Sequence, residues 1–168
     1  MTHLRALEPS DIDAIYRWEN DPTTWIYSAA HQPFSRNALQ RFINEHDGCD
    51  FYTSRQLRLM ADIDGIGTVG CVDLFDFDPF HRHAALGLLV DNSHRNKGYG
   101  SSILNEVESF AKDNFNLHQL FCDISEENIA CLRLFIKNGY NKCGTKKEWI
   151  WNSGSWTNAI SLQKIIGQ

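Results

Sequence analysis

Residues 94–100, HRNKGYG, combine two cationic side chains and two glycines between an apolar run and a segment with helical spacing. The first amide N–H groups of a helix lack partners and attract anions. Gly98 and Gly100 permit positive φ and remove the β-carbon, so a phosphate could approach the backbone, and Arg95 and Lys97 could add charged hydrogen bonds. A plain surface turn would use the same residues, so the loop alone leaves both alternatives open.

The spacing within this loop differs from two common phosphate-binding motifs. A P-loop requires GxxxxGK[ST], whereas here Lys97 precedes the glycine and no Lys-Ser or Lys-Thr pair follows. A Rossmann fingerprint requires a third glycine and an acidic residue about 20 residues later. The pattern is instead R-x-x-G-x-G, with Arg95, Gly98 and Gly100 in the defining places.

Side chains that could accept a proton are found in three short segments. Asp73 and Asp76 lie in VDLFDFD, His81 and His83 lie in FHRHA, and Glu148 lies in KKEWIW. Carboxylates and imidazoles are common general bases, and histidine titrates near neutral pH. Because most acidic side chains are solvated, an exposed strand face is the alternative for each acid, and an exposed turn is favoured for the two histidines.

Aromatic and sulfur side chains offer weaker candidates. Trp149, Trp151 and Trp156 alternate near the end of the sequence, where they could cage an amine, although packing in a core or an interface is favoured. The sequence places no His or Lys beside Cys131, so a structural role is favoured over an activated nucleophile.

Local patterns predict the elements that would position these residues. A short strand, LRAL, precedes a helix over residues 11–20, and residues 21–35 read as irregular loop before a second amphipathic helix. Residues 57–90 alternate strand and turn signals and predict an antiparallel meander. The glycine loop then opens a helix, QLFCDI reads as a buried strand, and a further helix ends at Asn138 and Gly139. Two strands joined by NSGS close the chain.

Composition limits the class of protein. With 168 residues, of which 42% are hydrophobic and 22% charged, one domain over residues 1–168 is expected. A formal charge of −5 argues against nucleic acid as a partner and suits a cationic or neutral one. Five scattered cysteines without a CxxC pair favour neither disulfides nor a metal site. No apolar leader or membrane-spanning stretch is visible, so we expect a cytoplasmic protein that does not bind membranes.

Several motifs in order resemble the GCN5-related N-acetyltransferases (GNAT), whose pyrophosphate loop has the form [R/Q]-x-x-G-x-[G/A]. ALGLLVDNSHRNKGYGSSIL resembles the central strand, loop and helix of that family. DISEENIACLRLFIKNGY resembles its next strand and helix, with Cys131 replacing the usual small residue. The resemblance is most specific over residues 69–162, and it extends to bacterial spermidine N-acetyltransferases and the ribosomal-protein N-terminal acetyltransferase branch.

The resemblance implies acetyl-CoA as cosubstrate and a direct attack of an amine on its thioester. It implies an α/β (α+β) fold, in which helices flank both faces of a mixed, strongly twisted sheet. The residues it assigns to the cofactor are Leu88, Leu89, Val90, Arg95, Asn96, Lys97, Gly98, Tyr99, Gly100, Ser101, Asn128, Phe135 and Lys137. Asn128 and Phe135 would face the cofactor, although a helix-capping role suits Asn128 equally well.

Two departures from the family pattern affect catalysis. Phe135 stands where many members have a tyrosine that protonates the leaving thiolate, and Ala85 stands where close relatives often have a glutamate. Asp73 and Glu148 occupy places that resemble acidic positions of the spermidine enzymes and could act as base or bind the amine. These departures keep a non-catalytic acyl-CoA-binding protein as the alternative function.

The acceptor is expected to be a polyamine-like small molecule, an amino sugar or a protein α-amine. In this family the early helices and loops choose the acceptor, here residues 21–47, where the resemblance is weakest. The aromatic terminal hairpin makes a homodimer a reasonable expectation.

Overall fold

The described part of the chain forms one seven-stranded sheet in the order β1-β2-β3-β4-β5-β7-β6. The computed structural model describes residues 1–25, 27, 31–46 and 48–167. The strands are β1 (Thr2–Ala6), β2 (Leu57–Ile63), β3 (Gly67–Asp78), β4 (His83–Val90), β5 (Gln119–Ser125), β6 (Asn141–Asn152) and β7 (Ser155–Ile165). The helices are η1 (Pro9–Asp11), α1 (Ile12–Glu19), α2 (Pro22–Trp25), α3 (Arg36–His46), α4 (Phe51–Ser54), η2 (Asn92–His94), α5 (Tyr99–Phe115) and α6 (Ile129–Lys137).

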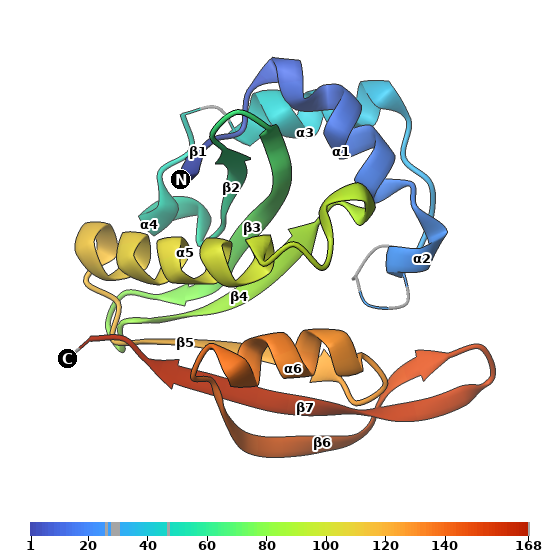
Figure 1. Cartoon of the computed structure of the whole chain (residues 1–168), viewed down its shortest axis with the longest axis vertical. Helices are drawn as coiled ribbons and strands as arrows, with labels where there is room; N and C mark the ends of the chain where they lie inside the picture. Colours follow the sequence, from blue (N-terminus) through green and yellow to red (C-terminus); the bar gives the residue numbers. More distant parts are fainter. Residues whose placement is uncertain (26, 28–30, 47, 168) are drawn as a thin grey trace.

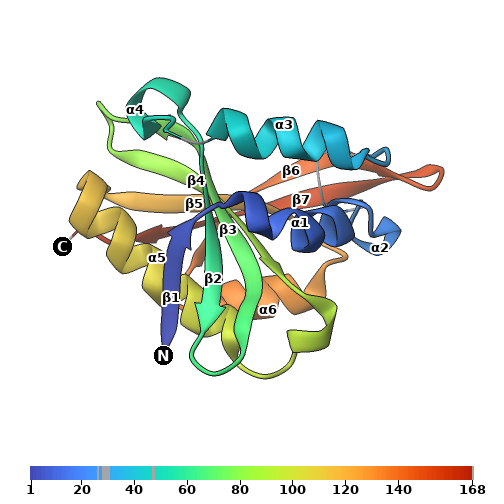
Figure 2. The ribbon, with the colours of Figure 1, turned by 90° about the horizontal axis from the view of Figure 1, so that it is seen from above.

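The sheet is mixed and strongly twisted, as the family resemblance implies. Neighbouring strands are antiparallel except β4 and β5, which run parallel. In the view from above, β1 and β2 run across the direction of β5 and β7 (Figure 2). The predicted meander from residue 57 to residue 90 is confirmed as β2, β3 and β4.

Helices cover both faces of the amino-terminal half of the sheet. Alternating residues of β2 show the division, because Leu59 and Ala61 join the core on the α5 side whereas Met60 joins the core beneath α1 and α3. The period of two in a strand sends these neighbours to opposite faces. Figure 1 shows α1 and α3 on one side of the sheet and α5 on the other.

The carboxyl-terminal half of the sheet has a different cover. In β5, Leu120, Cys122 and Ile124 are buried in the core shared with α5 and α6. Phe121 and Asp123 alternate with them and face away from α6, toward a pocket on the other side of β5, β7 and β6. Figure 1 shows α6 in front of these strands.

Most local predictions agree with the structure. The turn of the terminal hairpin lies at Ser153 and Gly154, which have φ of 48° and 96°, and α6 is followed by Gly139 with φ of 90°. Residues 21–35 contain the four-residue helix α2, so this segment is less irregular than predicted. Its residues 26 and 28–30, together with residue 47, lie outside the described residues.

Candidate functional site

The site is built around a fork between the two parallel strands. Backbone pairing between β4 and β5 covers three positions and ends at Ala85 and Phe121. Beyond it, residues 86–90 pair with β3 alone, and β5 continues along β7. Along Leu88, Leu89 and Val90, the backbone amide and carbonyl groups that do not pair with β3 point to the side where β5 has left. Such an edge can pair with an extended, amide-bearing ligand as a further strand would.

The loop after β4 brings a helix amino-terminus to the mouth of the fork. Gly98 caps α5 with φ of 85°, and a β-carbon there would meet nothing within 4 Å. The Ser101 amide donates to the Gly98 carbonyl at 3.1 Å, so the preceding amides of Tyr99 and Gly100 come before the first turn's hydrogen bonds. Open space, unpaired amides and a helix dipole together fit an anion such as a diphosphate.

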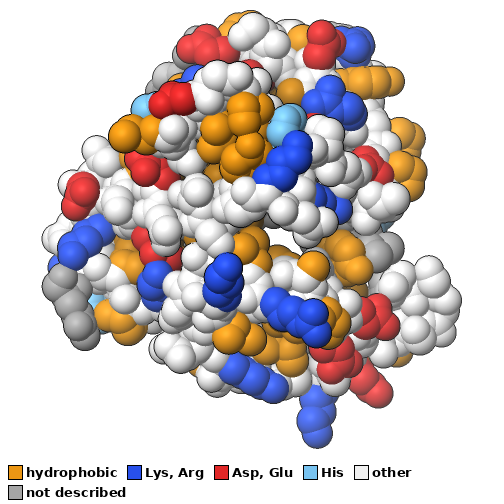
Figure 3. Space-filling view, viewed as in Figure 1, with side chains coloured by type: hydrophobic (Ala, Val, Ile, Leu, Met, Phe, Trp, Pro, Cys, Tyr) orange, Lys and Arg blue, Asp and Glu red, His pale blue; other side chains and the backbone are white. Residues whose placement is uncertain are grey.

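The two loop cations are oriented by the loop itself. The Arg95 guanidinium donates to the Val90 carbonyl at 3.1 Å, and the Lys97 ammonium donates to the Ser93 carbonyl at 2.9 Å. Asn96 has φ of 60°, a left-handed conformation that asparagine tolerates better than most residues. Figure 3 shows a hollow between the upper and lower parts of this face, with Lys and Arg side chains on both sides of it.

Gly100 has a different role from the one predicted. It lies inside the first turn of α5 and has no positive φ, and an added β-carbon would lie 2.9 Å from Leu134 Cδ2 of α6. Ser101 makes a second link, since its hydroxyl accepts a hydrogen bond from the Asn138 side chain at 3.0 Å. The glycine thus lets α5 and α6 approach closely, which places the two helices on either side of the fork.

A buried aspartate, not identified from the sequence, holds the loop in place. Asp91 is 7% exposed, and its carboxylate accepts hydrogen bonds from the Ser93 amide and hydroxyl, the Trp18 indole and the Arg17 guanidinium at 2.6–2.9 Å. Burial by itself would raise the pKa of Asp91, but these hydrogen bonds outweigh it and lower the pKa well below its usual range. The carboxylate ties the loop to α1.

The residues expected on α6 fall into three environments. Asn128 is the cap of α6, and its side-chain oxygen accepts a hydrogen bond from the Cys131 amide at 3.2 Å. Lys137 is exposed in the last turn. Phe135 is 2% exposed and packs against Tyr140 in the core, with ring centroids 4.9 Å apart. Hydrophobic burial thus draws the Phe135 ring into the core, and its contact with the cofactor stays a prediction.

Asp73 lies next to the fork but is engaged by an arginine. It pairs with Gly87 across β3 and β4, and Arg58 donates to its two oxygens at 2.7 and 3.0 Å. Arg58 also donates to Glu19 of α1 at 2.8 Å. Burial lowers the pKa of Arg58, but the attraction of Asp73 and Glu19 outweighs it, so the guanidinium stays charged. Proton acceptance by Asp73 must therefore compete with this pairing.

Two other predicted acids are placed on irregular parts of strands. Glu148 is exposed at a break in the β6–β7 register, with φ of 49°, and its amide donates to the Asn158 side chain at 2.9 Å. Asp76 is exposed at a similar break in β3, with φ of 49°. Among the described residues, neither acid contacts Asp73, so these candidates do not form one cluster.

The histidines and tryptophans also differ from expectation in part. His81 is exposed, as predicted. His83 begins β4, lines the pocket on the face of β5, β7 and β6 turned away from α6, and has a buried Nδ1 with no hydrogen-bond partner among the described residues. Trp149, Trp151 and Trp156 are 60%, 56% and 57% exposed, so the favoured role in a core is wrong for the chain as described.

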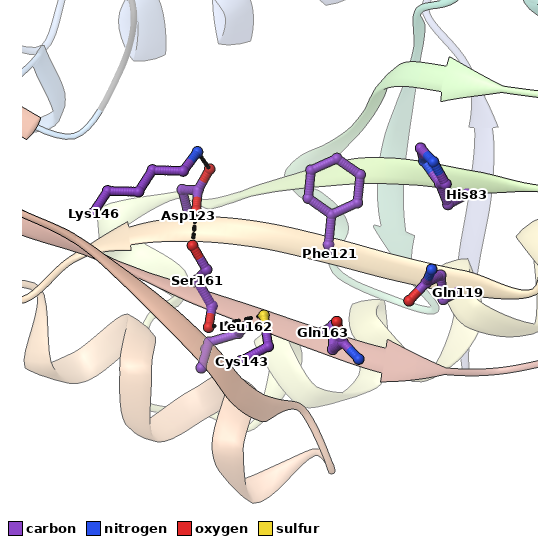
Figure 4. Close-up of a pocket in the computed structure, with 9 residues that line it drawn as sticks. All are labelled: His83, Gln119, Phe121, Asp123, Cys143, Lys146, Ser161, Leu162 and Gln163. Carbon is purple, nitrogen blue, oxygen red and sulfur yellow. Dashed lines mark hydrogen bonds and ion pairs between the residues drawn. The ribbon is translucent and has the colours of Figure 1, made fainter. Parts of the chain in front are cut away.

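A charged pair that the sequence did not predict lies on the face of β5, β7 and β6 turned away from α6. Asp123 of β5 accepts a hydrogen bond from the Lys146 ammonium at 2.6 Å and another from the Ser161 hydroxyl at 2.6 Å. The alternation in LFCDIS places Asp123 on the outward face, but nothing local pairs it with β6 or β7. These residues line a cavity of about 240 Å³ (Figure 4).

Cys131 has a structural role, as favoured from the sequence. Burial raises the pKa of its thiol to about 11, so the nucleophilic thiolate is disfavoured at neutral pH. Among the described residues, no group of three or more His, Cys, Asp or Glu side chains is placed to hold a metal ion. In the same described part of the chain, no helix is long and apolar enough to cross a membrane.

The fork, the open helix amino-terminus and the strand order define an acyl-CoA-dependent transferase fold. Residues 2–141 match the family model for the acetyltransferase (GNAT) domain, and the chain belongs to this family of N-acetyltransferases that use acetyl-CoA. Of the two alternatives for the loop, this membership favours a phosphate site over a plain turn.

The similar proteins give the comparison more detail. The chain is 23% identical over 153 residues to the spermidine N(1)-acetyltransferase of Vibrio cholerae serotype O1, covering 91% of this chain and 86% of that protein. It is 24% identical over 165 residues to the uncharacterized N-acetyltransferase YoaA of Bacillus subtilis, covering 96% and 92%. The resemblance to spermidine N-acetyltransferases is thus confirmed, whereas that to the ribosomal-protein branch stays a prediction.

Solved structures share the fold over nearly the whole chain. The crystal structure of the Vibrio cholerae spermidine N-acetyltransferase in complex with CoA and spermine has a TM-score of 0.88 at 21% identity, covering 98% of this chain and 95% of that one. A dodecameric structure of that enzyme has a TM-score of 0.81 at 21% identity, covering 98% and 94%.

Proposed function

We propose that this protein transfers the acetyl group of acetyl-CoA to a primary amine of a small, positively charged, polyamine-like molecule by direct attack. The observation that carries the proposal is the fork itself. The amino-terminus of α5, which can bind an anion, lies where the fork opens. The partly exposed carboxylates of Asp73 and Asp123 lie beside the fork on the face of the sheet turned away from α6. The cosubstrate and a cationic acceptor would therefore approach the reaction centre from opposite faces of the sheet.

The backbone of β4 supplies most of the positioning in this proposal. The free edge of Leu88, Leu89 and Val90 holds the amide-bearing arm of the cosubstrate, while Gly98, Tyr99, Gly100 and Ser101 provide the amide end for its diphosphate. An N–H of the same β4 edge stabilises the oxyanion that forms during attack. Holding both reactants in this geometry supplies much of the rate acceleration.

Proton transfer has to proceed without a hydroxyl at position 135. The thiol of the leaving group has a pKa near the cysteine reference of roughly 8.5, so a thiolate can depart at neutral pH. If no other group protonates the thiolate, the loss of a general acid at this position costs on the order of 100-fold in rate. The amine loses its proton to solvent or to one of the carboxylates proposed from the sequence, Asp73 or Glu148, of which Asp73 lies nearer to the fork by register.

Free thiol released from acetyl-CoA tests the proposal directly. Purified protein is incubated with acetyl-CoA and a panel of linear polyamines, amino sugars and peptides with a free amino-terminus. Release that is fastest with polyamines supports the proposal, and fastest release with another class would overturn the acceptor assignment. Tight CoA binding without thiol release across the panel would support the non-catalytic acyl-CoA-binding alternative.

A second copy of the chain is proposed as the partner of the terminal hairpin. β6 is an edge strand of the sheet, and the hairpin exposes the ring pair Trp151 and Trp156, whose centroids lie 5.1 Å apart. Exposed strand edges and aromatic side chains favour association. Light scattering of the wild-type protein and a Trp156→Ser variant tests this, with a wild-type monomer as the contrary result.

A further inference from the structure

The pocket on the face of β5, β7 and β6 turned away from α6 extends from His83 and Gln119, where β4 and β5 are paired, to Asp123, which lies just past the point where these strands separate. The last paired residue of β5 is Phe121, and Asp123 is the next residue of that strand to face away from α6. Phe121, Asp123, Lys146 and Ser161 all line the same cavity of about 240 Å³. The cavity is therefore next to the proposed reaction centre and on the face opposite α6.

Asp123 is held in one orientation by two contacts of 2.6 Å. The Ser161 hydroxyl donates to Oδ1, and the Lys146 ammonium donates to Oδ2 (Figure 4). The Asp123 side chain keeps 30% of its accessible surface, so the carboxylate is fixed but still reachable from solvent. A fixed carboxylate binds an ammonium group without first having to be ordered.

The Lys146 ammonium also faces an aromatic ring. Its Nζ lies 4.9 Å from the centroid of the Trp149 ring while it donates to Asp123. A carboxylate together with an indole face is a combination that recognises alkylammonium groups. The side chain of lysine is itself a four-carbon primary alkylamine, and 42% of its surface is accessible, so it can leave the carboxylate for water.

We propose that Asp123 and Trp149 form a binding seat for a primary alkylammonium group, that Lys146 fills this seat in the structure described here, and that a charged amine of the acceptor replaces Lys146 there. The inference rests on the proposed function, because it identifies the group that holds the non-reacting end of a diamine or polyamine. The reacting amine then lies toward the fork. An acceptor with a single amino group can fill the seat or react at the fork, but it cannot do both.

Calorimetric titration of 1,4-diaminobutane into the CoA-saturated protein tests the seat without relying on turnover. Lys146→Met removes the competing ammonium, and we expect diamine affinity to rise about tenfold. Asp123→Asn removes the carboxylate, and we expect affinity to fall about tenfold or more. Trp149→Leu should lower affinity only about two- to fivefold, the size of an exposed cation–π contact.

Controls separate the seat from general charge effects. Lys147→Met changes the same charge one residue away on β6, and Asp113→Asn does so for an exposed acid on α5. Both should leave diamine affinity unchanged, and 1,4-butanediol, which has the same chain without an ammonium group, should not respond to Lys146→Met. The melting temperature of each variant is compared with the wild type to exclude misfolding. Equal effects at positions 146 and 147 would overturn the proposal.

The titration and the thiol assay can overturn the seat and the proposed function separately. If no amine is acetylated but Lys146→Met still binds the diamine more tightly, the proposed function is wrong and the seat remains. If polyamines are acetylated and the Lys146 and Asp123 variants keep wild-type affinity and KM, the proposed function remains and the seat is overturned.

Discussion

The two sides of the fork are built in different ways. The proposed cosubstrate side comes mainly from one continuous segment, in which β4 leads through Gly98 into α5. The proposed acceptor side combines Asp73 of β3, Asp123 of β5 and Lys146 of β6, residues far apart in the sequence. A backbone-built anion site needs a short local pattern, whereas a side-chain site for a cation needs partners brought in by the sheet. The anion site can therefore be predicted from the sequence, whereas the cation site cannot.

Gly98→Glu, in the continuous segment, should have the largest effect of the variants considered. A left-handed glutamate at the mouth of the fork adds strain and a negative charge where a diphosphate binds, so CoA affinity should fall on the order of 100-fold. Gly65→Glu is the matched control, because Gly65 also has a left-handed φ of 73° with open space around it, but lies in the β2–β3 turn. Calorimetry that gives equal CoA affinities for the two variants would remove the loop from the site.

Asp91→Asn should weaken the cosubstrate side through the support beneath the loop. The neutral amide cannot accept the charged hydrogen bonds from Arg17, Trp18 and Ser93 equally well, so we expect about 2 kcal/mol lower stability. We also expect roughly tenfold weaker CoA binding, because the loop loses its link to α1. Asp113→Asn should change neither quantity in chemical denaturation or calorimetry.

The stability of the Asp91→Asn variant relative to wild type should also depend on pH. The folded-state pKa of Asp91 is lowered, so its stabilisation is present above the unfolded-state value of about 3.9 and is lost as the pH falls toward the folded-state value. Asp91→Asn should therefore be less stable than wild type near neutral pH, with the difference shrinking in acid. A constant difference across this range would contradict the assignment.

Asp73→Asn should affect the acceptor side with little change on the cosubstrate side. Because Arg58 occupies both oxygens, we expect KM for the amine to rise a few-fold and kcat to stay within about tenfold of wild type. CoA affinity should stay unchanged. Steady-state kinetics that show kcat about 100-fold lower at unchanged KM would instead identify Asp73 as the general base.

Gly100→Ala should have the smallest effect and probes the contact between the two sides. The added methyl group lies close to the flexible end of the Leu134 side chain on α6. We therefore expect the free energy of unfolding to change by no more than about 1 kcal/mol and CoA affinity to fall less than fivefold. Combining it with Leu134→Ala makes room for the methyl group. A double-mutant cycle should show favourable coupling, and strict additivity would mean that the two helices do not meet at this position.

Much of the fold could be predicted because its signals are local. The meander of β2 to β4, the turn at Ser153 and Gly154, and the end of α6 at Gly139 agree with short patterns of apolar residues and glycines. The loop could also be predicted from the sequence. The expectation of a positive φ at Gly100 was wrong, because a positive φ and close packing both favour glycine. Only the neighbour, Leu134, distinguishes the two causes.

The sequence by itself determined the glycine loop at the start of α5, the alternating faces of the strands and the membership of the acetyltransferases, because each depends on residues close together in the chain. Only the tertiary structure decided that Phe135 turns into the core, that Asp91 joins the loop to Trp18, and that Asp123 meets Lys146. Periodicity shows which face a side chain takes. The partner on that face depends on strand order and register, which bring together residues separated by 23 positions at Asp123 and Lys146 and by 73 at Trp18 and Asp91.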